Sequence, residues 1–577
     1  MNNQPQKNVY KSRSGPAVII LLIVAGVAVN FALKSVVTAL GLPMYLDCVG
    51  TVVAAALGGY MPGILVGFLT NVIIGLTDVP SLYYCSISVL IAVGAAFSAK
   101  RGGFRSIPGI ILTTLLLTLI GGGIGSVLTW LLSGQDFGDV ASSGLTKIVY
   151  SQGSLSPFAS QLVADLTVDV VDKAVTVVLS AIVLALIPEN AKDVLFMQGW
   201  KQAPLPEHMR SRVEERMYRI YSLRSKIVGF LAIAISVIGI VVTLISYTLY
   251  HGAILEQAET MGRSIANIAH SCIEPSRVDD YLTLGEKATD YLEVEKELEQ
   301  VKASSDDIEY VYVYRILEDG CHVVFDVDTA DTPGGNPGDI VEFDESFDEL
   351  LPKLLAGEPI DPIVTDDTFG WLLSVYKPVY DDAGKCMCYA CIDISMNKLK
   401  VKEQVFFTRI ISLFVGFFVV ILAIGLWLAE YSIILPINTM ALAAGAFAFN
   451  SESTRQESIE KIDSLQIVTG DEIENLYESV TKMGDDSMEY IEDSRKKAAQ
   501  IEKMQSGLIY VLADLVESRD KLTGDHIRKT AAYVRIILDQ VRREGLYRDV
   551  LTDEFCDDII NSAPLHDIGK IVVPDAI

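Results

Sequence analysis

The chain has 577 residues, a formal net charge of −27 and a hydrophobic content of 50%. Its apolar residues are gathered into runs, which predicts several membrane spans rather than one large soluble core. The acidic excess argues against a nucleic-acid-binding protein, because a phosphate-binding surface needs clustered Lys and Arg.

Six apolar runs lie in the first third of the chain, after the N-terminal residues 1–15. The runs are residues 16–37, 46–60, 62–76, 84–99, 107–132 and 174–187. Basic residues follow the fourth and the sixth runs, and basic loops stay in the cytoplasm. We therefore expect a six-span membrane module over residues 16–190, with a cytoplasmic N-terminus and a cytoplasmic linker over residues 191–225.

Two polar side chains, Asp47 and Asn71, lie in or near these runs, where a polar group is costly unless it has a function. Glycines around them recur at three- and four-residue spacing, which lets helices pack closely. The pattern resembles the six-span vitamin-binding subunits of energy-coupling-factor transporters. The resemblance implies a small ligand bound inside the membrane, with Asp47 and Asn71 as ligand-binding residues. A purely structural membrane anchor is the alternative.

A seventh apolar run at residues 226–249 and an eighth at residues 405–429 enclose a strongly acidic segment, residues 250–404. Because the preceding linker is expected in the cytoplasm, the seventh span carries the chain out and the eighth brings it back. We therefore expect a multi-pass protein of the cell membrane, with both termini cytoplasmic and residues 250–404 extracytoplasmic.

The acidic segment contains four strand-like runs, at residues 308–316, 321–328, 372–380 and 386–394. A helical stretch enters it from the seventh span, which predicts one α+β domain. This order resembles the extracytoplasmic, PAS-like Cache sensor domains of bacterial receptors. The resemblance implies a small-molecule ligand on the concave face of the sheet, with Trp371, Tyr376 and Asp393 as candidate ligand-binding residues. Core aromatics and a solvated carboxylate are the alternative interpretation.

Residues 430–484 open with Pro436-Ile437 and carry Asp471-Glu472-Ile473 at the start of a second helix. These features resemble a HAMP module, the parallel helix pair that links membrane receptors to effectors. HAMP modules act as dimeric four-helix bundles, so the resemblance implies a homodimer.

Apolar residues at heptad spacing run through the second helix and predict a coiled coil over residues 485–512. They are Ile473, Leu476, Val480 and Met483, followed in the same register by Ile501, Met504, Leu508, Val511 and Leu515. Ser487, Ser494 and Lys497 interrupt the seam, and a single amphipathic helix is the alternative. A coiled coil would transmit a shift or a rotation to the segment that follows it.

Two motifs in residues 513–577 point to a chemical function. Arg519-Asp520-x-x-Thr523-Gly524-x-His526 is followed, later in the segment, by Leu565-His566-Asp567-Ile568-Gly569-Lys570. Adjacent His and Asp side chains can face one cation, and imidazole and carboxylate ligands suit Mn, Fe and related divalent metals. Such a centre lowers the pKa of a bound water and holds phosphate oxygens.

The paired motifs resemble the HD superfamily of phosphohydrolases and, within it, the HD-GYP branch, most of whose members hydrolyse cyclic di-GMP. The resemblance implies an all-α domain in which His526, His566 and Asp567 are metal ligands. Lys570 and Asp520 match positions that meet the substrate phosphate, and they are the candidate catalytic residues.

Members of this branch that bind three metal ions carry a glutamate at the position that Leu522 occupies here. The leucine therefore indicates a centre of two metal ions, which we expect to be Mn or Fe. The sequence ends at Ile577, ahead of the family's further histidines, its last aspartate ligand and its Gly-Tyr-Pro segment. We therefore expect only part of the metal shell here and no hydrolysis by this chain alone.

Together these features predict a multi-domain membrane protein. It has an α-helical transmembrane bundle, an α+β sensor domain, a HAMP and coiled-coil connector, and a partial all-α HD domain. The predicted function is a receptor whose ligand gates a metal-dependent cyclic di-GMP phosphodiesterase. Two alternatives stay open: a non-catalytic receptor whose HD domain binds a nucleotide or a partner, and a vitamin-type transporter subunit with a regulatory tail.

Overall fold

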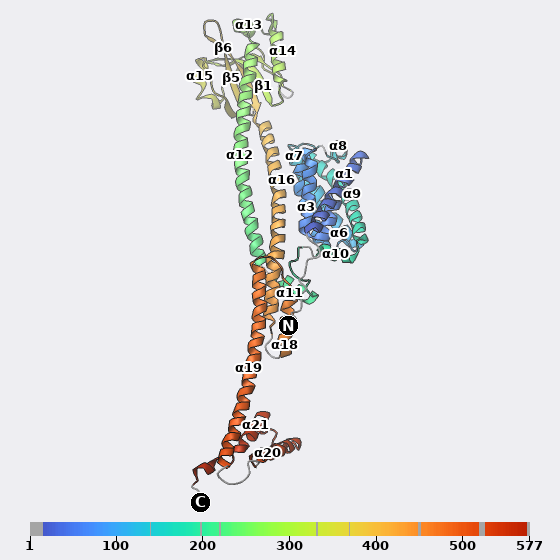
Figure 1. The fold of residues 1–577 in the computed structure, drawn as a ribbon. Helices are drawn as coiled ribbons and strands as arrows, with labels where there is room; N and C mark the ends of the chain where they lie inside the picture. The colour runs from blue at the N-terminus through green and yellow to red at the C-terminus, as the bar shows by residue number, and fades with distance from the viewer. Residues whose placement is uncertain are drawn as a thin grey trace. The chain divides into compact units, whose positions relative to one another are not determined.

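The computed structural model describes residues 16–573 apart from residues 139, 197–198, 218–220, 330–332, 368–369, 448–451 and 518–525. The chain divides into two compact units, and the boundary between them lies at Leu435 and Pro436. The order of helices and strands can be followed by colour in Figure 1. Most of the described residues are helical, and the first unit also contains one sheet.

The first unit begins with a bundle of apolar helices. They are α1 (Pro16–Ala39), α2 (Val49–Gly58), α3 (Tyr60–Gly75), α4 (Val79–Tyr83), α5 (Cys85–Lys100), α6 (Ile107–Thr118), the π-helical turn η1 (Leu119–Ile124), α7 (Gly125–Leu132), α8 (Ser143–Ser151) and α9 (Pro157–Leu186). Two short helices follow, α10 (Glu189–Phe196) and α11 (Glu207–Met217). Glycine lets the helices approach closely, since a Cβ added to Gly50 on α2 would collide with the Gly26 carbonyl oxygen on α1.

Among the described residues, four apolar helical stretches are long enough to cross a membrane, namely Ala17–Ala39, Ile107–Leu132, Leu223–Ser271 and Met396–Gly445. These helices support membrane association of the chain. Helices α2, α3 and α5 are apolar but shorter. Helix α9 has 30 residues and begins well before the predicted run at residues 174–187. The first half of α9 was not predicted, because Asp165, Asp169 and Asp172 interrupt the apolar run. All three aspartates nevertheless lie inside the helix.

The sheet domain lies between two long helices, α12 (Leu223–Ser271) and α16 (Met396–Ala429). Its strands are antiparallel in the order β3-β2-β1-β6-β5-β4. They are β1 (Ile308–Leu317), β2 (Gly320–Asp326), β3 (Ile340–Val341), β4 (Ile363–Asp367), β5 (Gly370–Tyr380) and β6 (Cys386–Ser395). The four predicted runs correspond to β1, β2, β5 and β6. Strands β3 and β4 were not predicted, because they are short strands at the two edges.

Short helices complete this domain, namely η2 (Pro275–Arg277), α13 (Val278–Leu284), η3 (Gly285–Lys287), α14 (Tyr291–Lys302), η4 (Glu345–Phe347) and α15 (Leu351–Leu355). Helices α12 and α14 cover one face of the sheet, and Ala266 and Leu298 are buried there with Ile392 of β6. Helix α12 runs close to the strands, because a Cβ added to Gly262 would press on Val375 of β5. The opposite face has its own apolar cluster, which includes Tyr389.

Helix α16 packs against both α12 and the apolar helical bundle. Phe406 stacks on Tyr250 of α12, with ring centroids 3.8 Å apart. Ser412 Oγ lies 2.7 Å from Ser86 Oγ on α5, and the ring of Phe417 meets Phe68 of α3 edge to face. Helix α16 ends in a π-helical turn, η5 (Glu430–Ile434). The contacts along α16 therefore join the sheet domain, α12 and the helical bundle in one unit.

The second unit contains the remaining helices. They are α17 (Leu435–Gly445), α18 (Glu452–Asp463), α19 (Glu472–Glu517), α20 (His526–Arg543), α21 (Asp553–Ser562) and the 3₁₀ turns η6 (Ala563–Leu565) and η7 (Ile568–Val572). Two acidic side chains accept hydrogen bonds from backbone N–H groups at the start of α19. Asp471 Oδ1 accepts a hydrogen bond from the Ile473 N–H at 3.0 Å, and Glu474 Oε2 accepts one from the Gly470 N–H at 2.7 Å.

Helix α19 exposes apolar side chains at heptad spacing, which we call the α19 stripe. Its members are Leu476, Met483, Tyr490, Ile501, Met504, Leu508, Val511 and Leu515, and each is between 48% and 75% exposed. An exposed apolar stripe of this length on one helix is typical of a surface that pairs with another helix.

The close approach of α12 to the sheet generates a stability prediction. Replacing Gly262 with Leu forces a side chain against Val375 and Ile394, and overpacking of this kind costs about 1–3 kcal/mol. Amides of β5 and β6 should then exchange with deuterium about 5- to 150-fold faster in the full chain in lipid nanodiscs. Gly252→Leu on the same helix is the control, since nothing lies within 4 Å of a Cβ there. Equal exchange in both variants would contradict this packing.

Candidate functional site

A cluster of two histidines and one aspartate forms in the second unit. His526 begins α20, while His566 and Asp567 lie between the turns η6 and η7. One ligand atom from each of the three lies within 4.8 Å of the others, and the two imidazole centroids are 5.5 Å apart. Segments about forty residues apart in sequence are thus brought to one place, as expected of a metal-binding cluster.

Neighbouring groups orient the side chains of this cluster. His566 Nδ1 lies 2.9 Å from the carbonyl oxygen of Ala563, so Nδ1–H donates and Nε2 is left as the metal-binding atom. Lys570 Nζ lies 2.9 Å from Asp567 Oδ2, and this hydrogen bond lowers the pKa of Asp567. Asp567 is therefore ionised at neutral pH, which is the form that binds a cation.

A small cavity of about 150 Å³ adjoins the cluster. It is lined by the three cluster residues and Lys570 on one side and by Ala513 and Val516 of α19 on the other. His526 and His566 are exposed, so solvent reaches the cluster. Asp520, the other candidate catalytic residue, and Leu522 lie outside the described residues.

The donor set fits a divalent transition metal. Two imidazole nitrogens and one carboxylate oxygen are ligands that Mn and Fe accept. Donors that share an ion through bonds of about 2.1 Å lie at most about 4.2 Å apart, so a shift of about 0.6 Å closes this cluster around one ion. Three protein donors leave coordination positions for water, for substrate oxygen or for further side chains.

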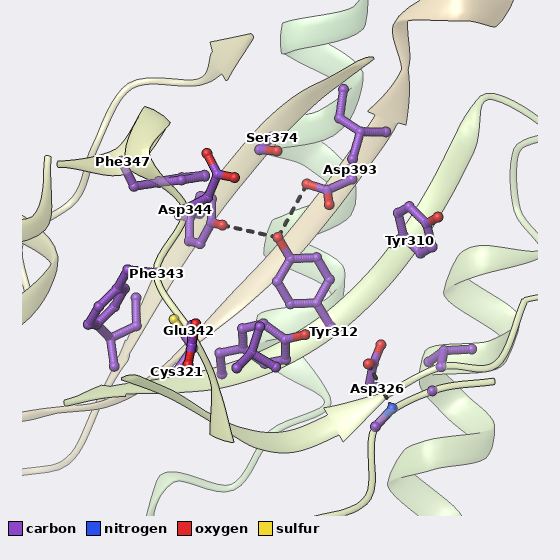
Figure 2. A pocket seen from close by; sticks show the side chains of 18 of the residues that line it. Tyr310, Tyr312, Cys321, Asp326, Glu342, Phe343, Asp344, Phe347, Ser374 and Asp393 are labelled. Atoms are coloured by element: carbon purple, nitrogen blue, oxygen red, sulfur yellow. Dashed lines mark hydrogen bonds between the residues drawn. The ribbon is translucent and has the colours of Figure 1, made fainter. Parts of the chain in front are cut away.

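A second candidate site is a cavity of about 270 Å³ in the sheet domain, on the face opposite α12 (Figure 2). Aromatic and acidic side chains converge on it. They are Tyr310, Tyr312, Tyr314, Phe343, Phe347 and Tyr376, together with Asp326, Glu342, Asp344 and Asp393. Among the described residues that line the cavity, none is Lys or Arg. This composition suits an uncharged or cationic ligand rather than an anion.

Hydrogen bonds link three side chains in the middle of this cavity, as Figure 2 shows. The hydroxyl oxygens of Tyr312 and Tyr376 are 3.1 Å apart, and Tyr312 also donates to Asp393 Oδ1 at 3.4 Å. Burial, with the Asp393 carboxylate adding to it, raises the pKa of Tyr312 well above its usual value. The phenol therefore stays protonated and keeps its hydrogen bond to the carboxylate.

The structure places the three predicted sensor residues on two faces of the sheet. Tyr376 and Asp393 line the cavity, whereas Trp371 packs beside the α12-side core. Side chains alternate along a strand, so an odd-numbered position of β5 faces away from Ser374 and Tyr376. Lys400 Nζ lies over the Trp371 ring, 5.6 Å from its centroid. The structure therefore does not bring Trp371 together with the other two.

Sequence reasoning missed the tyrosines of β1. Tyr310, Tyr312 and Tyr314 alternate with Val311 and Val313, and the alternation places all three on the cavity face. The two-residue period of this tyrosine run was visible in the sequence and would have identified them.

A third candidate site is a cavity of about 500 Å³ inside the apolar helical bundle. Asp47 and Asn71, the two predicted polar residues, both line it. Asn71 Nδ2 donates to Ser88 Oγ at 2.6 Å and to the Gly67 carbonyl oxygen at 3.1 Å. Two acids of α9, Asp165 and Asp169, line the same cavity and were not among the predicted ligand-binding residues.

Three curated relatives from Vibrio cholerae serotype O1 match part of the chain. A "probable cyclic di-GMP phosphodiesterase" is 38% identical over 82 residues, which are 14% of this chain and 19% of that protein. A "cyclic di-GMP phosphodiesterase" is 32% identical over 113 residues, 20% of this chain and 22% of that protein. A "3'3'-cGAMP-specific phosphodiesterase 2" is 40% identical over 70 residues, 12% of each.

The chain therefore spans about a fifth of the length of the first two relatives and less of the third. No protein-family model matches the chain. No solved structure matches it significantly. The partial relatives share one feature in their names, a phosphodiesterase that acts on a cyclic dinucleotide.

The histidine–aspartate cluster generates a metal-binding prediction for this chain. His566→Ala should weaken Mn²⁺ binding at least about tenfold, because even the loss of a group that only orients a ligand costs about 10- to 100-fold. Free Mn²⁺ can be measured by electron paramagnetic resonance during a titration of the purified chain. His322→Ala is the matched control, since His322 Nε2 also lies 3.0 Å from a carboxylate, that of Asp319. Equal affinity in the two variants would rule out the cluster as a metal site.

Proposed function

We propose that the chain is a membrane receptor with a metal-dependent phosphodiesterase centre at its cytoplasmic end, and that this centre acts on cyclic di-GMP. One observation carries the proposal: His526, His566 and Asp567 meet within 4.8 Å. The partial similarity to cyclic di-GMP phosphodiesterases supports the same chemistry. The third relative is named for 3'3'-cGAMP, so a cyclic dinucleotide is the substrate class that the three names share.

The metal ligands and the two candidate catalytic residues would have different roles at such a centre. His526, His566 and Asp567 would hold Mn or Fe, with a second ion in a complete domain. When bound, the metal supplies a water of lowered pKa and positive charge for the phosphate oxygens. Lys570 holds Asp567 ionised and oriented, and its ammonium group lies where a phosphate oxygen can replace that carboxylate as its partner. Asp520 is proposed to meet the substrate phosphate as well.

The sheet domain would supply the signal. We assign it the sensory role of a Cache-like domain, in which Tyr376 and Asp393 contact a small molecule outside the cell. Helix α12 is buried against the sheet, and α16 follows β6 directly, so a ligand-dependent movement of the strands changes both helices. Residues 430–484 would then act as a HAMP module, and α19 as the coiled coil that conveys the change.

A second candidate function is a receptor whose C-terminal domain binds a nucleotide or a partner without hydrolysis. A transporter subunit with a regulatory tail is the third possibility, and co-purification with coupling subunits would be its distinguishing property.

Hydrolysis of cyclic di-GMP by a protein that carries this chain together with a complete HD-type metal shell tests the proposal. With Mn²⁺ present, the wild type should form the linear dinucleotide or GMP, and His566→Ala should reduce the rate at least about 10³-fold, as loss of an essential catalytic group does. His322→Ala should keep the wild-type rate. Unchanged turnover in His566→Ala would overturn the assignment. Binding of cyclic di-GMP without turnover in the wild type would favour the non-catalytic receptor.

The α19 stripe generates a prediction about assembly. Leu508→Glu places a charge in the proposed helix–helix seam, so we expect the dimer dissociation constant to rise at least about tenfold. Mass photometry of the detergent-solubilised chain measures the dimer fraction. Lys503→Glu introduces the same side chain on α19 outside the stripe and should leave dimers intact. A wild-type chain that stays monomeric would contradict the proposed homodimer.

A further inference from the structure

The cavity in the apolar helical bundle is lined by two carboxyl groups that each keep one oxygen without a hydrogen-bond partner. Asp165 and Asp169 of α9 both line it, and they are only 9% and 4% exposed. Asp165 Oδ2 and Asp169 Oδ2 make no hydrogen bond to any described residue. Asp165 Oδ1 accepts a hydrogen bond from Ser142 Oγ. Ser126 Oγ and both polar atoms of the Gln161 side chain lie near Asp165 but make no hydrogen bond of good geometry to any described residue. Buried polar atoms in proteins are nearly always paired, so this set indicates a missing partner.

The neighbouring acid Asp172 shows what a structural carboxylate looks like on the same helix. Its Oδ1 accepts from the N–H groups of Tyr45 and Leu46 at 2.9 and 2.8 Å. Its Oδ2 pairs with Lys173 Nζ at 2.6 Å. Lys173 reaches Asp169 Oδ1 only at 3.3 Å. Asp172 is thus fully satisfied by the protein, whereas one oxygen of Asp169 is left over.

The π-helical turn η1 packs against α9 and has glycines beside these acids. Gly121 and Gly122 lie in the π-helical turn η1, and π-turns within α-helices are often found at functional sites. A Cβ added to Gly121 would collide with Asp169 Oδ2, and one added to Gly122 would lie 3.0 Å from Asp169 Cβ. The glycines therefore keep space around the carboxylate at a position where most residues would fill it.

The charges that line the cavity do not balance. Among the described residues that line it, four are acids, namely Asp47, Asp78, Asp165 and Asp169, and two carry ammonium groups, namely Lys34 and Lys173. Lys173 is also paired with Asp172. Lys34 is engaged at one end of the cavity, where it donates to Ser81 Oγ at 3.2 Å. A buried carboxylate without a counter-charge is costly, which favours a cationic occupant.

The volume of the cavity and its aromatic lining indicate which kind of cation fits it. A volume of about 500 Å³ is that of a site for a small organic molecule rather than for one bare ion. Tyr45 and Tyr84 line the cavity together with the acids, and an aromatic face attracts a cation. Tyr84 keeps its hydroxyl in place through Thr129 Oγ1 at 2.9 Å.

We propose that this cavity binds a small organic cation. The carboxyl groups of Asp165 and Asp169 pair with its protonated nitrogen groups, Ser126 adds a polar contact, and Tyr45 and Tyr84 cover its apolar part. The cavity shares no residue with the histidine–aspartate cluster. The cation-binding proposal therefore does not depend on the phosphodiesterase proposal.

Three probes of similar size and different charge test the proposal. Benzylammonium, benzyl alcohol and benzoate are titrated by calorimetry into the full chain in lipid nanodiscs, and heats from empty nanodiscs are subtracted. We expect saturable binding of benzylammonium with a dissociation constant at least about tenfold below that of benzyl alcohol, and no binding of benzoate. Equal affinities for the three probes, or no saturable binding of benzylammonium, would overturn the proposal. Suppression of that binding by low NaCl concentrations would instead assign the site to an inorganic cation.

Variants assign the binding to the named acids. Asp165→Asn and Asp169→Asn should each remove the preference for benzylammonium over benzyl alcohol. Asp136→Asn, an exposed acid of the same bundle, is the matched control and should bind like the wild type. Ser126→Ala alters one hydroxyl only, and it should weaken benzylammonium binding about two- to tenfold even if an aspartate variant does not fold. A preference that survives in folded Asp165→Asn and Asp169→Asn, or wild-type affinity in Ser126→Ala, would contradict the assignment.

Discussion

The packing of α12 against α16 is the constraint on which the first unit depends. Both helices are attached to the sheet, because α12 buries its small residues against β5 and β6 while α16 continues directly from β6. Lys402 Nζ ties α16 to Asp307 beside β1 at 2.6 Å, and farther along Arg224 Nε of α12 lies 3.5 Å from Glu430 Oε2 after α16. Helix α16 thus connects the sheet directly to the turn η5, and α12 packs alongside it. This arrangement is the physical basis for assigning the sheet domain a sensory role.

The same helix α16 also contacts the apolar bundle, so the bundle cannot rearrange without affecting it. Ser412 meets Ser86 of α5 and also donates to the Tyr83 carbonyl oxygen. Tyr84, the next residue, lines the cavity that holds the unpaired acids of α9. A ligand in that cavity and a ligand on the sheet would therefore act on the same helix from two sides.

The sequence predicted those parts of the fold whose pattern is local. The strand-like runs located β1, β2, β5 and β6, and Asp471-Glu472-Ile473 marked the start of α19. It could not locate β3 and β4, which are edge strands held by pairing with β2 and β5. The His526 cluster was predicted from two motifs and from the family resemblance that they carry. The opposite placement of Trp371 and Tyr376 follows from the alternation of side chains along β5, whose exact bounds only the structure gives. The unpaired second oxygens of Asp165 and Asp169 depend on tertiary contacts, and sequence alone does not show these.

The central claim is that the histidine–aspartate cluster holds a metal that acts on a cyclic dinucleotide. Removal and return of the metal test it most directly. Cyclic di-GMP hydrolysis by the full-length protein is measured by chromatography as purified, after treatment with EDTA and dialysis, and after addition of Mn²⁺ or Fe²⁺. The account predicts that chelation abolishes hydrolysis and that the added ion restores it. Hydrolysis that continues unchanged in the metal-depleted protein would contradict the account.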